Sequence, residues 1–182
     1  MTQLSELTPV SWWACEPRRL AQDQAEVAAD FPELSWRGDD AGSWLGRLPR
    51  WPFARLEPEG LEELVGDGMP VVVVYGHAYP MVPPAIYPRD PEPDPRKWTD
   101  AAWHVMGDGS LCLIQDDAMW SGRDRLGDLL RKAAGWRVEY ALMTAGLIDK
   151  MSLVGIVEDD TFDHLVTEAA ARKRVPTTDP SC

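Results

Sequence analysis

The chain has few basic residues for its length. Its 18 lysines and arginines face 30 aspartates and glutamates, so the 182 residues carry a net charge of −12. Nucleic acids and anionic membrane surfaces attract clustered basic side chains, and this balance therefore argues against both as partners. A partner with a basic face is compatible with it. The longest apolar run, around Val71–Tyr75, is far too short to cross a bilayer, so we expect no membrane-spanning segment.

Cysteine is also scarce. The chain has three cysteines, an odd number, and they are widely spaced at Cys15, Cys112 and Cys182. No Cys-x-x-Cys or Cys/His ligand pattern occurs. This spacing argues against a disulfide framework and against a zinc site, and we expect neither a metal nor a cofactor. The N-terminal residues lack the basic and apolar regions of a signal peptide. Free thiols suit a reducing compartment, so the sequence predicts a cytoplasmic protein.

The order of the sequence patterns predicts one domain of the α+β class, because the strands and the helices are segregated along the chain. We expect an N-terminal helix, an antiparallel meander sheet of about four strands, a cysteine-bearing segment and C-terminal helices. The predicted helices cover 16–31, 125–148 and 160–174, with a short acidic helix or loop over 57–67. The predicted strands cover 34–37, 43–51 and 70–75, and an extended segment over 103–114 is interrupted by a turn at Gly107-Asp108-Gly109. Residues 1–15 form an N-terminal extension, 16–174 the domain and 175–182 a flexible tail.

Three local features sharpen this prediction. The unbroken valine run of the strand over 70–75 predicts a central strand buried on both faces. Seven prolines between Pro80 and Pro95 exclude a helix or a central strand there. Gly135 and Gly146 should weaken the long helix or split it in two.

Cys112 is the best candidate for chemistry in the chain. It lies in the run Gly107-Asp108-Gly109-Ser110-Leu111-Cys112-Leu113-Ile114, where the glycines let the backbone approach a substrate closely. The acidic neighbours Asp108, Asp116 and Asp117 disfavour a strongly activated thiolate. Such a thiol suits exchange with an already activated thioester better than hydrolysis of a stable amide. Taken alone, this run favours a core cysteine buried in a strand, because free Cys is among the most buried residue types.

Two further segments bear on this choice. The run Tyr79-Pro80-Met81-Val82-Pro83-Pro84-Ala85-Ile86-Tyr87 precedes the cysteine, and Trp120 follows it. Together with Gly109-Ser110-Leu111-Cys112-Leu113, they resemble the proline signature, the active-site segment and the downstream tryptophan of ubiquitin-conjugating (E2) enzymes. The resemblance covers about residues 16–150 and implies the fold of that superfamily.

The resemblance implies a transferase. A ubiquitin-activating (E1) type of enzyme would pass an activated C-terminal glycine to Cys112 as a thioester, and Cys112 would donate it to a target amine. Tyr79, Pro80, Pro83 and Pro84 would frame the active-site segment, with Gly109 at its turn. Trp120 would pack beneath or beside it.

The sequence departs from the family just upstream of the cysteine. The family's His-Pro-Asn is replaced by Trp103-His104-Val105-Met106, which lacks the proline and the asparagine. Oxyanion support would then come from backbone amides around Gly107–Ser110 or from His104, although a His in an extended segment is often a packed structural donor. Asp100, Asp116 or Asp117 could help to deprotonate the incoming amine.

These departures, with Ser121-Gly122 after the tryptophan and the run from Asp128 to Trp136, resemble compact bacterial E2-like proteins of antiphage systems. Some join a ubiquitin-like protein to targets, and others, in CBASS operons, join the C-terminus of a cGAS-like nucleotidyltransferase. Two alternatives stay open. One is a non-catalytic E2-variant binding module, and the other is a cysteine hydrolase that pairs Cys112 with His77, His104 or His164.

Overall fold

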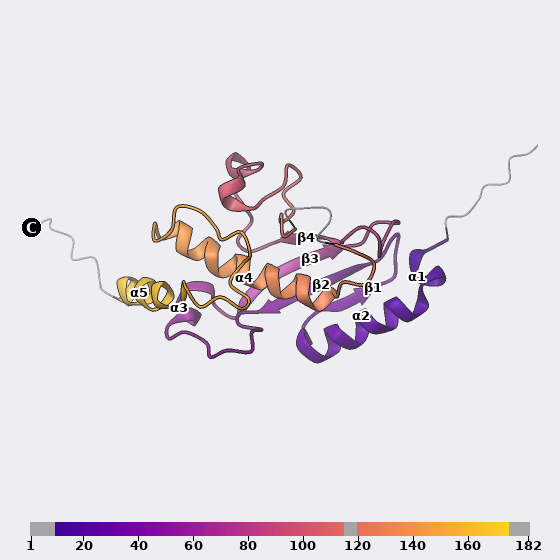
Figure 1. Cartoon of the computed structure of the whole chain (residues 1–182), viewed down its shortest axis with the longest axis horizontal. Helices are drawn as coiled ribbons and strands as arrows, with labels where there is room; N and C mark the ends of the chain where they lie inside the picture. Colours follow the sequence, from indigo (N-terminus) through magenta and orange to yellow (C-terminus); the bar gives the residue numbers. More distant parts are fainter. Residues whose placement is uncertain (1–9, 115–119, 175–182) are drawn as a thin grey trace, which may run out of the picture.

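The computed structural model describes residues 10–114 and 120–174. Its strands form one antiparallel sheet in the order β1-β2-β3-β4, and each strand pairs with its neighbours in sequence (Figure 1). The predicted α+β class and the four-strand antiparallel sheet are confirmed. The helices are α1 (Trp12–Cys15), α2 (Pro17–Asp30), α3 (Leu61–Val65), α4 (Leu126–Thr144) and α5 (Asp163–Arg174), and the strands are β1 (Ser35–Arg37), β2 (Ser43–Pro49), β3 (Gly68–Val74) and β4 (Ala85–Pro88).

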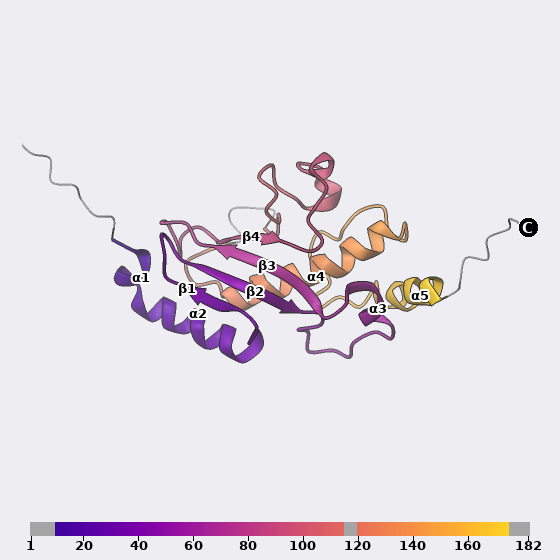
Figure 2. The same cartoon turned by 180° about the vertical axis from the view of Figure 1, so that it is seen from behind.

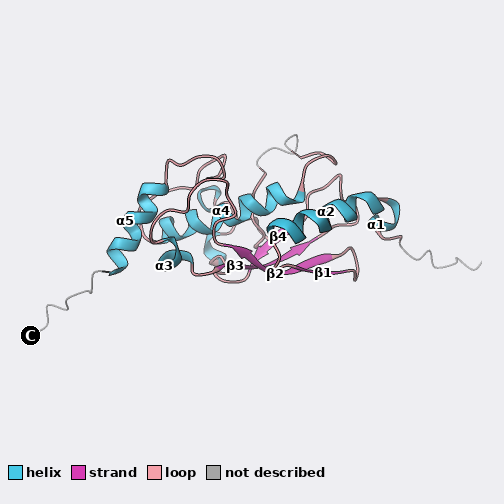
Figure 3. Ribbon diagram, turned by 90° about the horizontal axis from the view of Figure 1, so that it is seen from below, coloured by secondary structure: helices cyan, strands magenta, loops and turns pink. Residues whose placement is uncertain are grey.

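Helices α2 and α4 cover one face of the sheet (Figure 3), and in Figure 2 the opposite face has no described helix over it. Burial along β3 alternates accordingly. Val71 and Val73 are 2% and 0% exposed, whereas Val74 is 38% exposed. The prediction of a strand buried on both faces is therefore wrong: the valine run has helices on one side only.

Strand β4 lies inside the proline-rich region. It is an edge strand that, among the described strands, pairs with β3 alone, with Val71 opposite Pro88 and Val74 opposite Ala85. An edge position tolerates proline because one side of the strand needs no hydrogen-bond donors. The sequence pattern did not predict β4. The exclusion of a central strand from the proline-rich region is confirmed, because β4 lies at the edge of the sheet.

Helix α4 runs unbroken through Gly135, which is buried. A Cβ at this position would approach Ile156 Cγ1 to 3.2 Å, so the glycine permits close packing and does not end the helix. The helix ends at Thr144, before Gly146, whose φ is +69°. Helix α5 begins at Asp163, three residues later than predicted.

The buried face of α2 carries charge. Arg19, Asp23 and Glu26 are 7%, 0% and 8% exposed, and they share this face with Val27. Trp12 of α1 also lies in the core and donates from Nε1 to the carbonyl of Ala41 at 2.7 Å. Part of the N-terminal extension therefore packs onto the sheet.

Over the described ranges, no helix has both the length and the apolarity needed to cross a membrane. In the same ranges, no group of three or more His, Cys, Asp or Glu side chains could hold a metal ion.

Candidate active site

The segment that carries Cys112 is a tight backbone loop. Cys112 N donates to the carbonyl of His104 at 2.8 Å, and Met106 N donates to that of Ser110 at 2.8 Å. Val105 and Leu111 form an isolated bridge, and Leu111 N donates to Ile86 of β4 at 2.9 Å. The turn predicted at Gly107-Asp108-Gly109 is therefore confirmed, and the segment is fastened to the sheet edge. It begins with a 3-10 turn over Ala101–Trp103 and not with extended backbone.

Asp108 organises the tip of this loop. Its Oδ1 accepts from Ser110 N at 2.9 Å and from Ser110 Oγ at 2.6 Å, and its Oδ2 accepts from the Tyr87 hydroxyl at 3.0 Å. The hydrogen bonds from Ser110 lower the pKa of Asp108, so the carboxylate stays ionised. Its charge is therefore engaged in holding the turn.

The loop amides have other partners. Gly109 N donates to Met106 O, Ser110 N to Asp108 Oδ1, and Leu111 N and Cys112 N to Ile86 O and His104 O. The expectation that amides near Ser110 support an oxyanion is wrong for Gly109 and Ser110, because both already donate within the loop.

Cys112 is half-buried, and its Sγ lies 3.9 Å from the carbonyl oxygen of Ile114. It does not lie in a strand, and it lines two clefts, of about 430 Å³ and about 410 Å³. Cys112 therefore borders open space, which a fully buried core cysteine does not.

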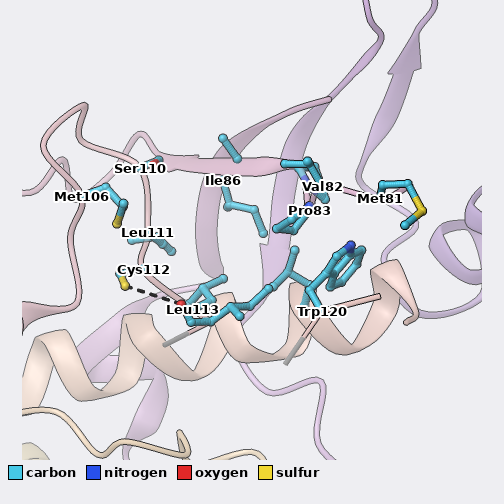
Figure 4. Close-up of a pocket in the computed structure, with 14 residues that line it drawn as sticks. Met81, Val82, Pro83, Ile86, Met106, Ser110, Leu111, Cys112, Leu113 and Trp120 are labelled. Atoms are coloured by element: carbon cyan, nitrogen blue, oxygen red, sulfur yellow. Dashed lines mark hydrogen bonds between the residues drawn. The ribbon is translucent and has the colours of Figure 1, made fainter. Parts of the chain in front are cut away.

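The first cleft is mostly apolar. Figure 4 shows Cys112 and Met106 at one end and Trp120 and Met81 at the other. Its walls are the proline segment over 81–86, the cysteine segment over 110–114, Trp120 and Leu129 of α4. Trp120 donates from Nε1 to the carbonyl of Pro80 at 3.0 Å, so the predicted tryptophan and the predicted proline motif meet directly.

The proline motif is anchored in the core by Tyr79. This side chain is 3% exposed, and its hydroxyl donates to Asp23 Oδ2 at 2.7 Å. Burial and the neighbouring Asp23 carboxylate raise the pKa of Tyr79 far above its usual value, so the phenol stays a donor. The Tyr75 hydroxyl donates to the same oxygen at 2.9 Å. Pro83 and Pro84 line the first cleft.

Arg19 links this anchor to the chain beyond Trp120. Its guanidinium pairs with Asp23 at 2.9 Å and donates to the carbonyls of Gly122 at 2.9 Å and Asp124 at 2.6 Å. Sequence reasoning missed both Arg19 and Asp23, because charged residues on a helix normally face water.

The second cleft contains the polar candidates. It is lined by Asp100, His104, Met106, Cys112 and Leu153, among others. His104 has the left-handed conformation, with φ of 48°, and burial lowers the pKa of its imidazole. The ring is therefore neutral at pH 7. The Asp100 side chain accepts from Ala102 N at 2.9 Å and so starts the 3-10 turn.

Leu153 is a cleft residue that sequence reasoning missed. It is 76% exposed, and the two residues before it in the chain are held by hydrogen bonds to two different segments. Glu139 of α4 accepts from Ser152 N at 2.6 Å and from Ser152 Oγ at 2.8 Å, while Met151 N donates to Ala102 O at 3.0 Å. No sequence signal connected this loop to the cysteine.

The other candidates lie elsewhere. His77 is exposed, 3.6 Å from Asp40, and His164 is exposed on α5, and neither lines a cleft with Cys112. Cys15 is exposed on α1. Asp116, Asp117 and Cys182 lie outside the described residues.

Comparison of the chain with protein-family models, curated proteins and solved structures finds no match. The placement of Cys112 between two clefts, framed by the proline motif and Trp120, is therefore the basis on which its function is inferred.

Proposed function

We propose that the chain is an E2-like conjugating enzyme of the ubiquitin-conjugating superfamily, with Cys112 as its acyl carrier. The donor would be the C-terminal glycine of a ubiquitin-like protein or of a cGAS-like nucleotidyltransferase. An E1-like enzyme would supply it as a thioester, and a target protein would supply the acceptor amine. A role in bacterial antiphage defence follows from the same resemblance.

The observation that carries the proposal is the position of Cys112 between two separate clefts. An acyl transferase must hold a donor and an acceptor on either side of one carbonyl carbon. The order of elements adds support, because a leading helix, a four-strand meander, the cysteine loop and a following helix occur in the order that the resemblance implies.

The proposed reaction consists of two acyl transfers. In the first, the Cys112 sulfur loses its proton, attacks the carbonyl of the incoming thioester, and the thiol of the activating enzyme leaves. In the second, the target amine attacks the Cys112 thioester and loses a proton, and the Cys112 sulfur leaves and regains one. The first step exchanges one thioester for another of similar energy, and the second converts a thioester into a more stable amide. Neither step needs a cofactor from this chain.

We assign the clefts by their lining. The first has proline, methionine, leucine and tryptophan walls and suits the extended C-terminal segment of the donor. The second adds the Asp100 carboxylate and the neutral His104 imidazole, which suit an approaching lysine. A carboxylate attracts the ammonium, and a neutral imidazole can accept its proton.

A non-catalytic E2-variant module is the second candidate, favoured by one observation. The amides of Gly109, Ser110, Leu111 and Cys112 all donate within the protein, which leaves the transfer step without these oxyanion donors. Under this alternative the clefts would bind partners without an acyl group passing to Cys112.

The test uses the full chain with ATP and the activating enzyme and donor protein encoded beside its gene. We expect an adduct on a non-reducing gel that reductant removes. Cys112→Ala should abolish it, and Cys112→Ser should give an ester adduct that resists reductant. Cys15→Ser is the matched control and should form the adduct normally, because Cys15 lines neither cleft.

Two outcomes contradict the proposal. An adduct that survives in Cys112→Ala would place the acyl group on another residue. Stable binding of the activating enzyme with no adduct on the wild-type chain would support the non-catalytic module.

A further inference from the structure

A separate cleft of about 480 Å³ lies at the end of the molecule formed by α3, α5 and the C-terminal half of α4 (Figure 1). Leu64, Tyr140 and Ala141 contribute apolar walls, and Arg137, Arg172 and Lys173 contribute positive charge. It shares no lining residue with either cleft of Cys112. In a chain with a net charge of −12, three cations around one apolar hollow are unusual.

Arg137 is the residue that needs a partner. Its Nη2 donates to the carbonyl of Leu64 at 3.2 Å, while its Nε is buried without a hydrogen-bond partner. Among the described residues, no carboxylate lies within ion-pair distance of it, and Asp90 acts on it only at longer range. Burial lowers the pKa of this guanidinium, and the more distant Asp90 and Tyr140 offset this only in part.

Other arginines withdrawn from solvent show the usual arrangement. Arg19 pairs with Asp23, Arg55 pairs with Asp163 and Arg131 pairs with Asp30. The two further cations of the cleft also have partners, since Arg172 pairs with Glu168 and Lys173 donates to the carbonyl of Glu63. Arg137 thus differs in being half-buried, charged and unmatched by a carboxylate.

We propose that this cleft binds an acidic segment of a partner protein, whose carboxylate pairs with Arg137. A guanidinium presents paired N–H donors in the spacing of a carboxylate, which makes a planar carboxylate its best-matched anion. An apolar side chain beside that carboxylate packs on Tyr140 and Ala141. The rim is open, with Arg172 58% exposed, so the ligand stays partly in water, as a segment of a larger partner does.

The probe is the blocked peptide acetyl-Glu-Leu-Glu-amide, with acetyl-Gln-Leu-Gln-amide as its uncharged match. Each is titrated at millimolar concentration into the full chain, followed by two-dimensional NMR of the backbone amides. We expect saturable shifts at Leu64, Ala141 and Ala169 with the acidic peptide only. Binding should weaken about tenfold in Arg137→Gln, the loss of one charge-assisted pair, and should be unchanged in Arg37→Gln, an exposed arginine on β1.

Equal shifts with both peptides, an unchanged affinity for the acidic peptide in Arg137→Gln, or no saturable shift at these residues would each overturn the proposal. A second measurement needs no ligand. Because Arg137→Met removes a desolvated, unpaired charge and keeps the apolar stem, we expect an equal or higher melting temperature. A lowered melting temperature would assign Arg137 to structure through Leu64 and would equally overturn it. These readouts do not involve Cys112, so they are independent of the proposed function.

Discussion

Gly109 meets two requirements at the turn before the cysteine. Its φ is +83°, in the left-handed region, and a Cβ there would lie 2.9 Å from Cζ2 of Trp98. The glycine therefore fixes both the backbone of the loop and its contact with the segment over 95–100.

Substituting Gly109 tests this at the residue scale. We expect Gly109→Ala to lower the free energy of unfolding by about 1–3 kcal/mol, from the unfavourable φ and the overlap with the indole ring. Urea denaturation measures the change. The control is Gly76→Ala, because Gly76 is exposed, has no positive φ and has open space around its Cβ position. An equal loss of unfolding free energy in Gly109→Ala and Gly76→Ala would contradict the special requirement for glycine at position 109.

Residue patterns identified part of the site and missed part of it. Cys112, Tyr79, Pro80 and Trp120 carry motifs that are visible in the sequence, and the structure brings them together. The role of Asp23 was not predicted, because its hydrogen-bond partners Tyr75 and Tyr79 lie 52 and 56 residues away in the sequence. The sequence does not show which hydrogen-bond donors will surround a charged residue of a helix in the folded protein.

His104 illustrates a second kind of miss. A run of Trp, His, Val and Met predicts extended backbone, yet His104 is left-handed and ends the 3-10 turn that Asp100 begins. Its carbonyl is needed by Cys112 N. The hydrogen bond from Cys112 N offsets the strain of the left-handed backbone at His104. A local sequence pattern cannot predict a hydrogen bond between segments.

At the scale of elements, α4 depends on α2 for its N-terminal cap. Arg125 at the N-cap makes no side-chain cap bond. Instead, Glu26 of α2 accepts from Gly127 N at 3.0 Å through Oε2 and from Arg125 Nε at 2.8 Å through Oε1. Burial alone would raise the pKa of Glu26, but hydrogen bonds from Gln22, Gly127 and Arg125 lower it overall.

We therefore expect Glu26→Ala to lower the free energy of unfolding at pH 7 by about 1–2 kcal/mol, the usual value of a helix cap. Because the folded pKa is depressed, the wild-type contribution is present above pH 4.5 and is lost as the pH falls through the folded pKa. Urea denaturation at neutral and acid pH measures both effects. Gln24→Ala, at an exposed position of the same helix, should change little. A cost that is independent of pH would argue against the ionised cap.

Element prediction succeeded where one signal dominated. The valines of β3 and the long apolar pattern of α4 gave elements of the right type with boundaries shifted by a few residues. Burial of both faces of β3 was wrongly expected, because an apolar run does not reveal whether anything covers its second face. Strand β4 was hidden because proline is a poor strand signal except at an edge.

At the scale of the whole molecule, stability should depend on pH through Glu139. This carboxyl is 2% exposed, and its partner is Ser152 alone among the described residues. Burial raises its pKa above 4.5, so the folded protein prefers the protonated form. The stability that it contributes is full below pH 4.5 and is lost as the pH rises through the folded pKa.

Glu139→Gln keeps a hydrogen-bonding group of the same shape and removes the buried charge. We expect the free energy of unfolding of this variant, relative to the wild type, to increase between pH 4 and pH 7, because only the wild type ionises a buried carboxyl in this range. Denaturation across this range measures it. Glu158→Gln, at an exposed position, provides the baseline. A flat difference would mean that Glu139 titrates alike in the folded and unfolded chains.

The pairing order of the strands has a consequence for how the chain folds. Each strand pairs with its neighbour in sequence, whereas Arg19 and Glu26 reach partners 103 and 101 residues away. Contacts between near neighbours close short loops and form quickly, and distant contacts form slowly. We expect the meander to form early and α4 to dock late, so that Cys112 and Trp120 come to share one cleft only at the end of folding. A chain caught part-way would have its sheet but not the cleft between Cys112 and Trp120, so the acyl exchange proposed for Cys112 would begin only once the fold was complete.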